Sequence, residues 1–329
     1  MRGVTLALLW ALLFLLIFAP AQGQRDLSGA AGIALQLEKL NVLGSVLMIA
    51  AHPDDENTAL LAYFARGRKV RTAYLSATRG EGGQNLIGPE QGDLLGVIRT
   101  QELLAARRID GAEQFFTRAI DFGFTKTPEE TLEKWGRERI LSDMVWTIRH
   151  YRPDVVILRF SGTPRDGHGQ HQVSAIIGRE AYTAAADKTR FSEQNIEPWK
   201  AKRLLANILN FPNMQQGAQK KGPPDPPSAG QIDIDTAEYN PVLGKSYNEI
   251  AGLSRSQHKS QAMGSEEKRG GPSKTSFNVL AGDPVTADPL DGVDTSWSRL
   301  PGGGAVGRFW RKQRRLSRRK IHPKRFLCC

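Results

Sequence analysis

The stretch VLMIAAHPDDEN, residues 46–57, passes from an uninterrupted apolar run into His-Pro and three consecutive acids. An apolar run of this kind is typical of a strand that is buried on both faces of a parallel sheet. Three adjacent carboxylates repel one another unless a cation gathers them or water surrounds them. The stretch therefore predicts a buried strand that ends at a cation site or at the surface.

Strands and helices alternate outward from this stretch as far as about residue 210. Strands are expected at 45–51, 70–78, 113–121 and 154–160, and helices at 30–40, 57–67, 92–111, 127–153 and 171–187. Strands that alternate with helices of ten or more residues form βαβ units with a parallel sheet. The predicted fold class is α/β, a Rossmann-like, doubly wound, mainly parallel sheet with helices on both faces, over residues 30–210.

The N-terminus resembles a secretory signal. Arg2 supplies a positive charge, residues 4–18 are apolar, and small residues follow, so residues 1–23 are predicted to be a signal peptide. An uncleaved membrane anchor is the alternative, although the run is short for a full span. We expect an exported protein, periplasmic or extracellular.

The rest of the chain divides by composition. Residues 211–231 are rich in Pro, Gly, Gln and Lys and are expected to form a linker. Residues 232–300 are turn-rich and are expected to form a partial accessory region. Residues 301–329 are expected to be a basic, disordered tail. The abrupt change of composition there also suggests a truncated or frame-shifted C-terminus.

Charge and cysteine usage restrict the function. Residues 301–329 hold ten Lys or Arg and no acid, so the net charge of +11 falls to +1 for the preceding part of the chain. No nucleic-acid partner is expected, and membrane contact is expected only through an uncleaved signal or the basic tail. The two cysteines are Cys328 and Cys329, so a metal in the body of the chain must be held by His, Asp or Glu.

Two pairs of residues follow predicted strands at metal-ligand spacing. His52 and Asp55 are three apart, and His168 and His171 are again three apart far along the chain. Two imidazoles and a carboxylate with an open fourth position are typical of a catalytic zinc site, and iron(II) also suits them. Such a metal lowers the pKa of a water, and Asp54 is placed to take that water's proton.

Each feature also has an ordinary structural interpretation. HPDD can be a strand-end turn before a helix, and an HxxH pair is often exposed on a surface. The predicted fold instead brings His52, the RGEGGQN turn at 79–85, Asp121 and the loop before His171 to one edge of the sheet, where ligands bind. The glycine-rich turn either cradles substrate or is a flexible loop. It is not a GxGxxG fingerprint, which excludes a nicotinamide enzyme.

AAHPDDE at 50–56 followed by HGQH at 168–171 resembles the LmbE/PIG-L family of zinc-dependent N-acetylglucosaminyl deacetylases, over residues 44–210. RTQELLAARRIDG, which begins at Arg99, is similar to the family's Arg-x-x-Glu-Leu helix. The resemblance implies zinc ligands, a general base, a cation near the developing oxyanion and two sugar contacts. The implied zinc ligands are His52, Asp55 and His171, and the implied general base is Asp54. His168 would be the cation, and Arg99 and Asp121 would contact the sugar.

One residue departs from the family pattern. Gln170 stands where the family has Asp, which puts the orientation of His171 in question. Residues 246–264, SYNEIAGLSRSQHKSQAMG, resemble a stretch of longer, exported members, which implies a truncated member. Glu56 is expected to lie in the first turn of the next helix, near its positive end.

The expected function is metal-dependent release of acetate from an N-acetylated sugar or glycoconjugate. A non-catalytic glycan-binding or structural envelope protein on the same fold is the first alternative. An interaction protein that acts through its basic tail is the second.

Overall fold

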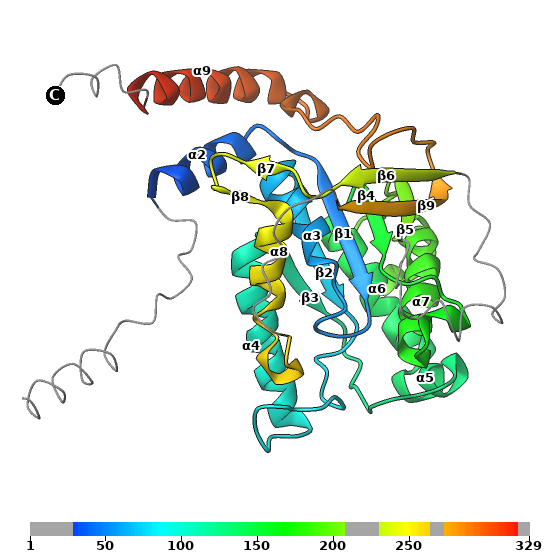
Figure 1. Cartoon of the computed structure of the whole chain (residues 1–329). Coiled ribbons are helices and arrows are strands. Elements are labelled where there is room, and N and C mark those ends of the chain that lie inside the picture. The colour runs from blue at the N-terminus through cyan, green and yellow to red at the C-terminus, as the bar shows by residue number, and fades with distance from the viewer. Residues whose placement is uncertain (1–28, 208–229, 264–272, 322–329) are drawn as a thin grey trace, which may run out of the picture.

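The computed structural model describes residues 29–207, 230–263 and 273–321 (Figure 1). The expected signal peptide and residues 211–229 of the expected linker lie outside these ranges. Within them, no helix is both long enough and apolar enough to cross a membrane.

Seven strands of the described residues form one mixed sheet, in the order β3-β2-β1-β4-β5-β9-β6. The strands are β1 (Ser45–Ala50), β2 (Arg71–Ser76), β3 (Glu113–Phe116), β4 (Val155–Leu158), β5 (Arg203–Asn207), β6 (Gln231–Asp235) and β9 (Lys274–Gly282). The first five in this order run parallel, and β9 is antiparallel to both β5 and β6. The strand order reverses between β1 and β4, which is where doubly wound sheets bind ligands. The predicted fold class is confirmed.

The apolar run of the opening stretch explains why β1 is central. All six of its residues are buried. Met48 lies opposite Tyr74 of β2 on one side and Ile157 of β4 on the other. Burial of a side chain such as Met48 contributes about 1.5–3 kcal/mol relative to its exposed state. The run therefore fixes the strand to which the HPDDE turn is attached.

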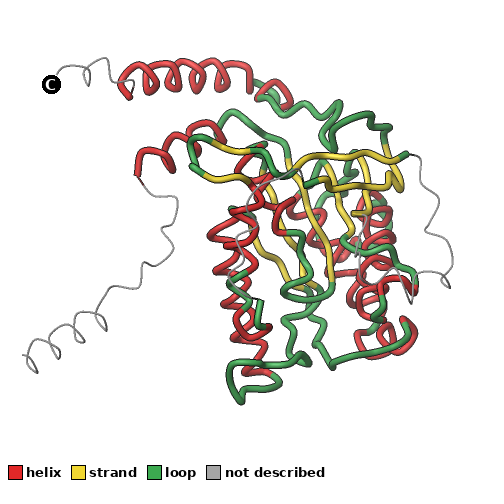
Figure 2. Tube along the Cα trace, in the orientation of Figure 1, coloured by secondary structure: helices red, strands yellow, loops and turns green. Residues whose placement is uncertain are grey.

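Helices cover both faces of the sheet (Figures 1 and 2). One face carries α3, α4 and α8, which pack on one another, and the other carries α5, α6 and α7. The bounds are α3 (Thr58–Ala62), which continues as the π-helical turn η1 (Tyr63–Gly67), α4 (Asp93–Asp110), α5 (Pro128–Trp135), α6 (Arg137–Tyr151), α7 (Gly169–Ala186) and α8 (Tyr247–Arg255).

The helix expected over 127–153 is two helices. It begins as predicted, because the Thr127 side chain accepts a hydrogen bond from the Glu130 N–H and Pro128 is the first helical residue. It breaks at Gly136, whose φ of +74° ends α5 and precedes α6. Only glycine adopts this conformation without strain, and the helical periodicity on either side concealed the break.

The region expected to be accessory is part of the same sheet. β6 and β9 extend it beyond β5, and α8 packs against α3 and α4. β6 alternates exposed and buried residues, and Ile232 and Ile234 enter the main core. A turn-rich segment of this length cannot bury a core alone, so its apolar side chains complete the core of the neighbouring domain.

Smaller elements flank the sheet. They are α2 (Gly29–Lys39), which matches the helix expected at 30–40, the hairpin of β7 (Tyr239–Asn240) and β8 (Lys245–Ser246), and the short helices η2 (Pro164–Asp166), η3 (Ser192–Gln194), η4 (Lys259–Gln261) and η5 (Trp297–Arg299). The basic segment that was expected to be disordered instead forms α9 (Gly303–Ile321), which packs on η5. Arg, Lys, Gln and Leu are strong helix formers, and this local preference outweighs the expectation drawn from charge.

Candidate active site

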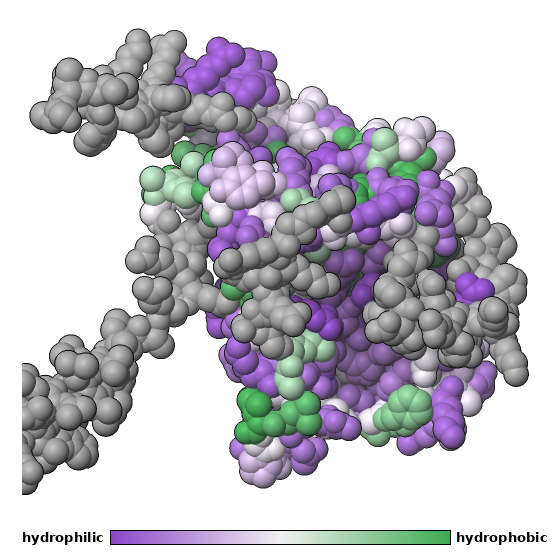
Figure 3. All heavy atoms as spheres, in the orientation of Figure 1, coloured by the Kyte–Doolittle hydropathy of each residue, from purple (hydrophilic) through white to green (hydrophobic). Residues whose placement is uncertain are grey.

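The loops that follow β1, β2, β3 and β4 meet at the carboxyl edge of the sheet. The face drawn in Figure 3 is hydrophilic across the hollow at this edge, and an apolar patch lies apart from it at the foot of α4. The patch contains Leu86, Ile87, Leu94 and Val97, each more than half exposed. The hollow is thus suited to a polar ligand.

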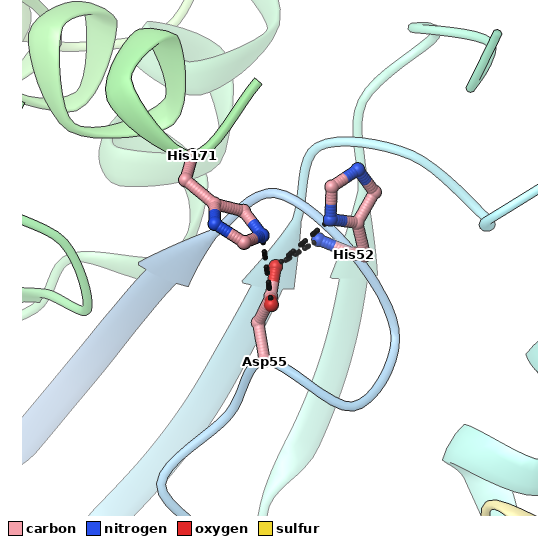
Figure 4. A group of neighbouring side chains, drawn as sticks. All are labelled: His52, Asp55 and His171. Carbon is pink, nitrogen blue, oxygen red and sulfur yellow. Dashed lines mark hydrogen bonds and ion pairs between the residues drawn. The ribbon is translucent and has the colours of Figure 1, made fainter. Parts of the chain in front are cut away.

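Three predicted metal ligands converge at this edge of the sheet (Figure 4). His52 and Asp55 come from the turn after β1, and His171 comes from the first turn of α7. One donor atom of each lies within 4.8 Å of the others. Asp55 is central: its Oδ2 is 3.1 Å from Nδ1 of His52, and its Oδ1 is 3.3 Å from Nε2 of His171.

Hydrogen bonds on the far side of each imidazole direct the facing nitrogens toward Asp55, where a metal would bind. His171 donates from Nδ1 to the carbonyl oxygen of Asp166 at 3.0 Å, so its Nε2 faces Asp55 with a lone pair. His52 donates from Nε2 to Oε1 of Gln170 at 2.5 Å, which directs Nδ1 toward Asp55. Two neutral imidazoles and an ionised carboxylate suit zinc or iron(II), so the residues present fit the expected metal.

Gln170 therefore orients a different ligand from the one expected. The departure from the family pattern put the orientation of His171 in question, but that ring is held by a backbone carbonyl. Gln170 is fully buried, and its Nε2 donates to the carbonyl oxygen of Gly123 at 2.9 Å, which fixes the amide with Oε1 toward His52. A neutral acceptor thus stands behind His52.

Electrostatics at the metal group favour a positive charge. Burial opposes ionisation of Asp55, but the imidazoles of His171 and His52 hold its pKa well below the ordinary value. Burial also opposes a charged His52, but the carboxylates of Asp55 and Asp121 raise its pKa to about 9. A proton occupies the His52–Asp55 contact at neutral pH when no metal is bound, and a cation must displace it.

Asp54 lies beside this group in an uncommon backbone conformation. Its φ is +92°, which is sparsely populated for a residue with a side chain. Its N–H donates to Oε2 of Glu56 at 2.9 Å, and its Oδ2 is 3.2 Å from Nη2 of Arg99. Burial and the adjacent Asp55 raise the pKa of Asp54 to about 6, against the opposing charge of Arg99. A carboxyl that titrates just below neutrality suits a general base.

Arg99 supports the loops of the site and does not face the open hollow. Only 3% of Arg99 is exposed, and it donates to the carbonyl oxygens of Pro53 at 2.6 Å and Gly80 at 3.1 Å. A Cβ at Gly80 or Gly83 would lie within 2.5 Å of its guanidinium. The sugar contact that the resemblance implied for Arg99 does not match this burial. Gly80 and Gly83 of the RGEGGQN turn make room for Arg99, whereas a Cβ at Gly82 would meet the backbone of Gly123. The substrate cradle stays a prediction.

His168 lies at the mouth of the site as the N-cap of α7. Its Nδ1 accepts the Gln170 N–H at 3.1 Å, so Nε2 carries the proton. Burial and the neighbouring His52 and His171 lower the pKa of His168 to about 4. The structure therefore favours a neutral N–H donor at this position, where the resemblance implied a cation. The ring of Phe124, which is 68% exposed, meets that of His168 edge-on at 4.9 Å.

Asp121 lies at the same edge, where its position predicted it. Its Oδ1 is 3.9 Å from Nε2 of His52 and accepts the Gly123 N–H at 3.0 Å. Its own N–H donates to Glu81 of the glycine-rich turn at 3.1 Å. Asp121 is 6% exposed, so in this structure it contributes chiefly to the field at His52.

Glu56 is a residue that the sequence reasoning misjudged. It precedes Asn57, the N-cap of α3, and so lies outside the helical turn in which it was expected. Its side chain is fully buried and pairs with Arg107 and with His258 from beyond α8. The signal available in the sequence is His258, in a segment that resembles a stretch of longer family members.

Comparison with known proteins agrees with this geometry. Residues 47–182 match the family model described as PIG-L, GlcNAc-PI de-N-acetylase. These residues are similar to the PIG-L family. All of the candidate site residues named from the sequence fall inside the match.

Individual relatives are distant. The chain is 29% identical over 150 residues to diacetylchitobiose deacetylase of Thermococcus kodakarensis, which covers 45% of this chain and 52% of that protein. It is 28% identical over 183 residues to 1D-myo-inositol 2-acetamido-2-deoxy-alpha-D-glucopyranoside deacetylase 1 of Frankia alni, with 49% and 61% covered. The chain thus spans roughly half to three-fifths of the length of these curated relatives.

Among solved structures, 4-carboxy-2-hydroxymuconate hydratase of Pseudomonas putida matches 74% of this chain and 99% of its own, with a TM-score of 0.47 and 15% identity.

Proposed function

We propose that this protein hydrolyses the N-acetyl group of an amino sugar or a related amide, with release of acetate. The observation that carries the proposal is the convergence of His52, Asp55 and His171 on one point. The Asp54 carboxyl is near enough to interact electrostatically with Asp55 and His52, and the ring of His168 lies 5.3 Å from that of His52. A base, a metal group and an oxyanion donor in one hydrophilic recess are the parts that amide hydrolysis requires.

The metal is proposed to be zinc, with iron(II) as the alternative. His52, Asp55 and His171 would hold it, because they offer two imidazole nitrogens and one carboxylate at one point. The chemistry that zinc supplies at such a group is polarisation of a carbonyl and acidification of a water.

Asp54 is proposed to move the proton. As a carboxylate, it takes a proton from the attacking water while that water adds to the amide carbonyl carbon. Once protonated, it returns this proton to the departing nitrogen as the C–N bond breaks. A pKa of about 6 for Asp54 suits both roles, since the carboxylate is the main form at neutral pH and the acid is a competent donor.

His168 is proposed to stabilise the oxyanion through its Nε2–H. Because Nδ1 is occupied by the helix N-terminus, the proton position is fixed before substrate arrives. A preorganised neutral donor stabilises developing charge without first losing a proton. Phe124, beside His168 and exposed, offers an apolar face to one side of a bound sugar ring.

We also propose that the protein is exported, on the basis of the apolar N-terminal segment, and that it acts on an envelope or extracellular N-acetylated glycan. The curated deacetylases that it resembles support an N-acetylated sugar as the substrate class. Contact with a membrane, through an uncleaved signal or the basic C-terminal segment, belongs to the same proposal.

The test is acetate release from a panel of N-acetyl amino sugars, with and without a metal chelator. We expect release that the chelator stops and that added zinc or iron(II) restores. The Asp54→Asn protein is the matched control, since it keeps the metal group. Glycan binding without acetate release in the metal-loaded protein would instead favour the non-catalytic alternative.

A further inference from the structure

A buried network of charged groups joins the HPDDE turn to the C-terminal part of the domain. Glu56 and His258 are 202 residues apart, and neither side chain is exposed to solvent. Oε1 of Glu56 accepts from Nε2 of His258 at 2.8 Å and from Nη2 of Arg107 at 3.1 Å. Oε2 of the same carboxylate accepts the Asp54 N–H at 2.9 Å. Glu56 thus connects His258 to the backbone of the proposed base.

Arg107 alone does not satisfy the carboxylates around it. Its guanidinium also binds Asp110, at 2.6 and 3.1 Å, and Asp110 takes a further hydrogen bond from the Ser254 hydroxyl. One guanidinium is therefore shared between two buried carboxylates. His258 supplies the remaining donor to Glu56, and a buried carboxylate that lost it would be under-satisfied.

The ring of His258 makes one polar contact among the described residues. Its Nδ1 is buried without a hydrogen-bond partner there, so the contact between Nε2 and Glu56 is what sets the ring's orientation. A histidine kept for packing alone would be replaceable by an apolar side chain. A second contact from the same segment reaches the turn, where Nη1 of Arg255 donates to the Asp54 carbonyl at 3.4 Å.

The conformation of Asp54 needs such support. A residue other than glycine at φ +92° is held there only when its surroundings over-determine it. The N–H of Asp54 is fixed by Glu56 and its carbonyl is met by Arg255, so the segment from α8 to η4 supports both sides of this residue. Rotation about its backbone would break the contact between Oδ2 of Asp54 and Nη2 of Arg99.

We propose that His258 is a positioning residue for the proposed deacetylation: through Glu56, it holds the backbone of Asp54 so that the carboxylate keeps its position against Arg99, next to the metal ligand Asp55. This inference rests on the proposed role of Asp54. It also connects His258, which follows α8, to the turn that carries Asp54.

The test compares four full-length, metal-loaded proteins. His258→Leu removes the donor and keeps the bulk. His258→Gln returns an amide donor near the position of Nε2, whereas His258→Asn places one near Nδ1, away from Glu56. Ser260→Ala is the matched control, because Ser260 is equally buried, lies two residues away and binds Glu102, not the turn. The measurements are kcat, KM, metal content and hydrogen exchange of peptides covering residues 50–57.

We expect His258→Leu and His258→Asn to lower kcat about 10–100-fold, the range found when an orienting partner of a site is lost. KM and metal content should change little, and amide exchange in the 50–57 peptide should become faster. His258→Gln should recover most of kcat and of the protection. Ser260→Ala should match the wild type in both.

Wild-type kcat and protection in His258→Leu would overturn the proposal, and so would equal losses in His258→Gln and His258→Asn. If His258→Leu fails to fold, the comparison of His258→Gln with His258→Asn tests the proposal, because these two variants differ only in the position of the amide donor. If the wild-type protein releases no acetate, the proposed function fails by itself. The exchange measurement then still decides whether His258 holds the turn.

Discussion

Replacement of Asp54 by Asn tests the proposed mechanism most directly. The amide keeps the size of the carboxylate, and its oxygen can still accept from Arg99, which is 3.2 Å from Oδ2 of Asp54. Asn is also, with Asp, among the side chains that best tolerate positive φ, so the turn at φ +92° should be retained. The substitution removes the base and little else. Ala would be a poorer choice, because it adds about 1–2 kcal/mol of backbone strain in the left-handed region.

The expected magnitude follows from the ionisation of Asp54. With a pKa of about 6, roughly nine-tenths of the wild-type carboxyls are ionised at pH 7, so almost every molecule has its base. Loss of a general base lowers rates by about 10²–10⁴-fold, which is about 2.7–5.5 kcal/mol of transition-state stabilisation. A bound dication lowers the pKa of Asp54 from this raised value, so the acidic limb of the wild-type kcat/KM profile should lie at or below pH 6.

The assay is acetate release against pH for wild-type and Asp54→Asn protein, with metal content and melting temperature measured on the same samples. We expect equal metal content, similar melting temperatures, a kcat lower by the factor above and no acidic limb between pH 4.5 and 7 in the variant. A variant that keeps more than a third of wild-type kcat with the same pH profile would refute the assignment of Asp54 as the base. Loss of metal together with activity would place Asp54 among the ligands instead.

Three further outcomes are expected. Asp55→Ala should weaken zinc binding by more than about a hundredfold, because it removes the central ligand and not merely an orienting partner. Competition for zinc with a chromophoric chelator measures this, and an unchanged Kd would contradict the assignment of Asp55 as a metal ligand. Zinc binding should release about one proton at pH 7, because the metal must displace the proton that His52 holds with a pKa of about 9. The affinity for zinc should therefore rise about tenfold per pH unit between pH 6 and 8 and level off near pH 9. Calorimetry in buffers of different ionisation enthalpy tests this, and a pH-independent Kd would show that His52 is not a ligand. Gln170→Leu should weaken zinc binding about 10–100-fold while Gln170→Glu retains it, since only the latter keeps an acceptor for Nε2 of His52; equal affinities for the two variants would mean that the contact does not orient the ring.

The fold was largely predictable because its signals are local. The apolar run of β1 and the alternation of strand and helix as far as α7 appear in the sequence as they do in the sheet, whereas β5 was not among the expected strands. The break at Gly136 was not predicted, because the residues on both sides keep helical periodicity and one glycine is a weak signal. The pairing of β9 with β5 was not predicted either, since it joins Leu205 to Val279 across a long intervening segment and no local pattern names a strand's partner.

The candidate site also has a part that the sequence predicted and a part that required the structure. His52, Asp54 and Asp55 are neighbours in sequence, and their chemistry could be named from residue types and spacing. The position of His171 follows from the rule that strand ends share one edge. The charge states follow from burial, which a sequence does not display, and so the neutral His168 and the raised pKa of Asp54 required the structure.

By itself, the sequence determined the strand that ends in HPDDE, the doubly wound sheet, and the kinds of atom available to a metal at its edge. These depend on hydrophobic periodicity and on the chemistry of neighbouring residues. Only the tertiary structure decided that Gln170 stands behind His52, that Arg99 is a support inside the loops, and that Glu56 is bound by His258 from 202 residues away. Hydrogen bonds between distant residues depend on packing to within a few tenths of an ångström, and only the folded chain sets those distances.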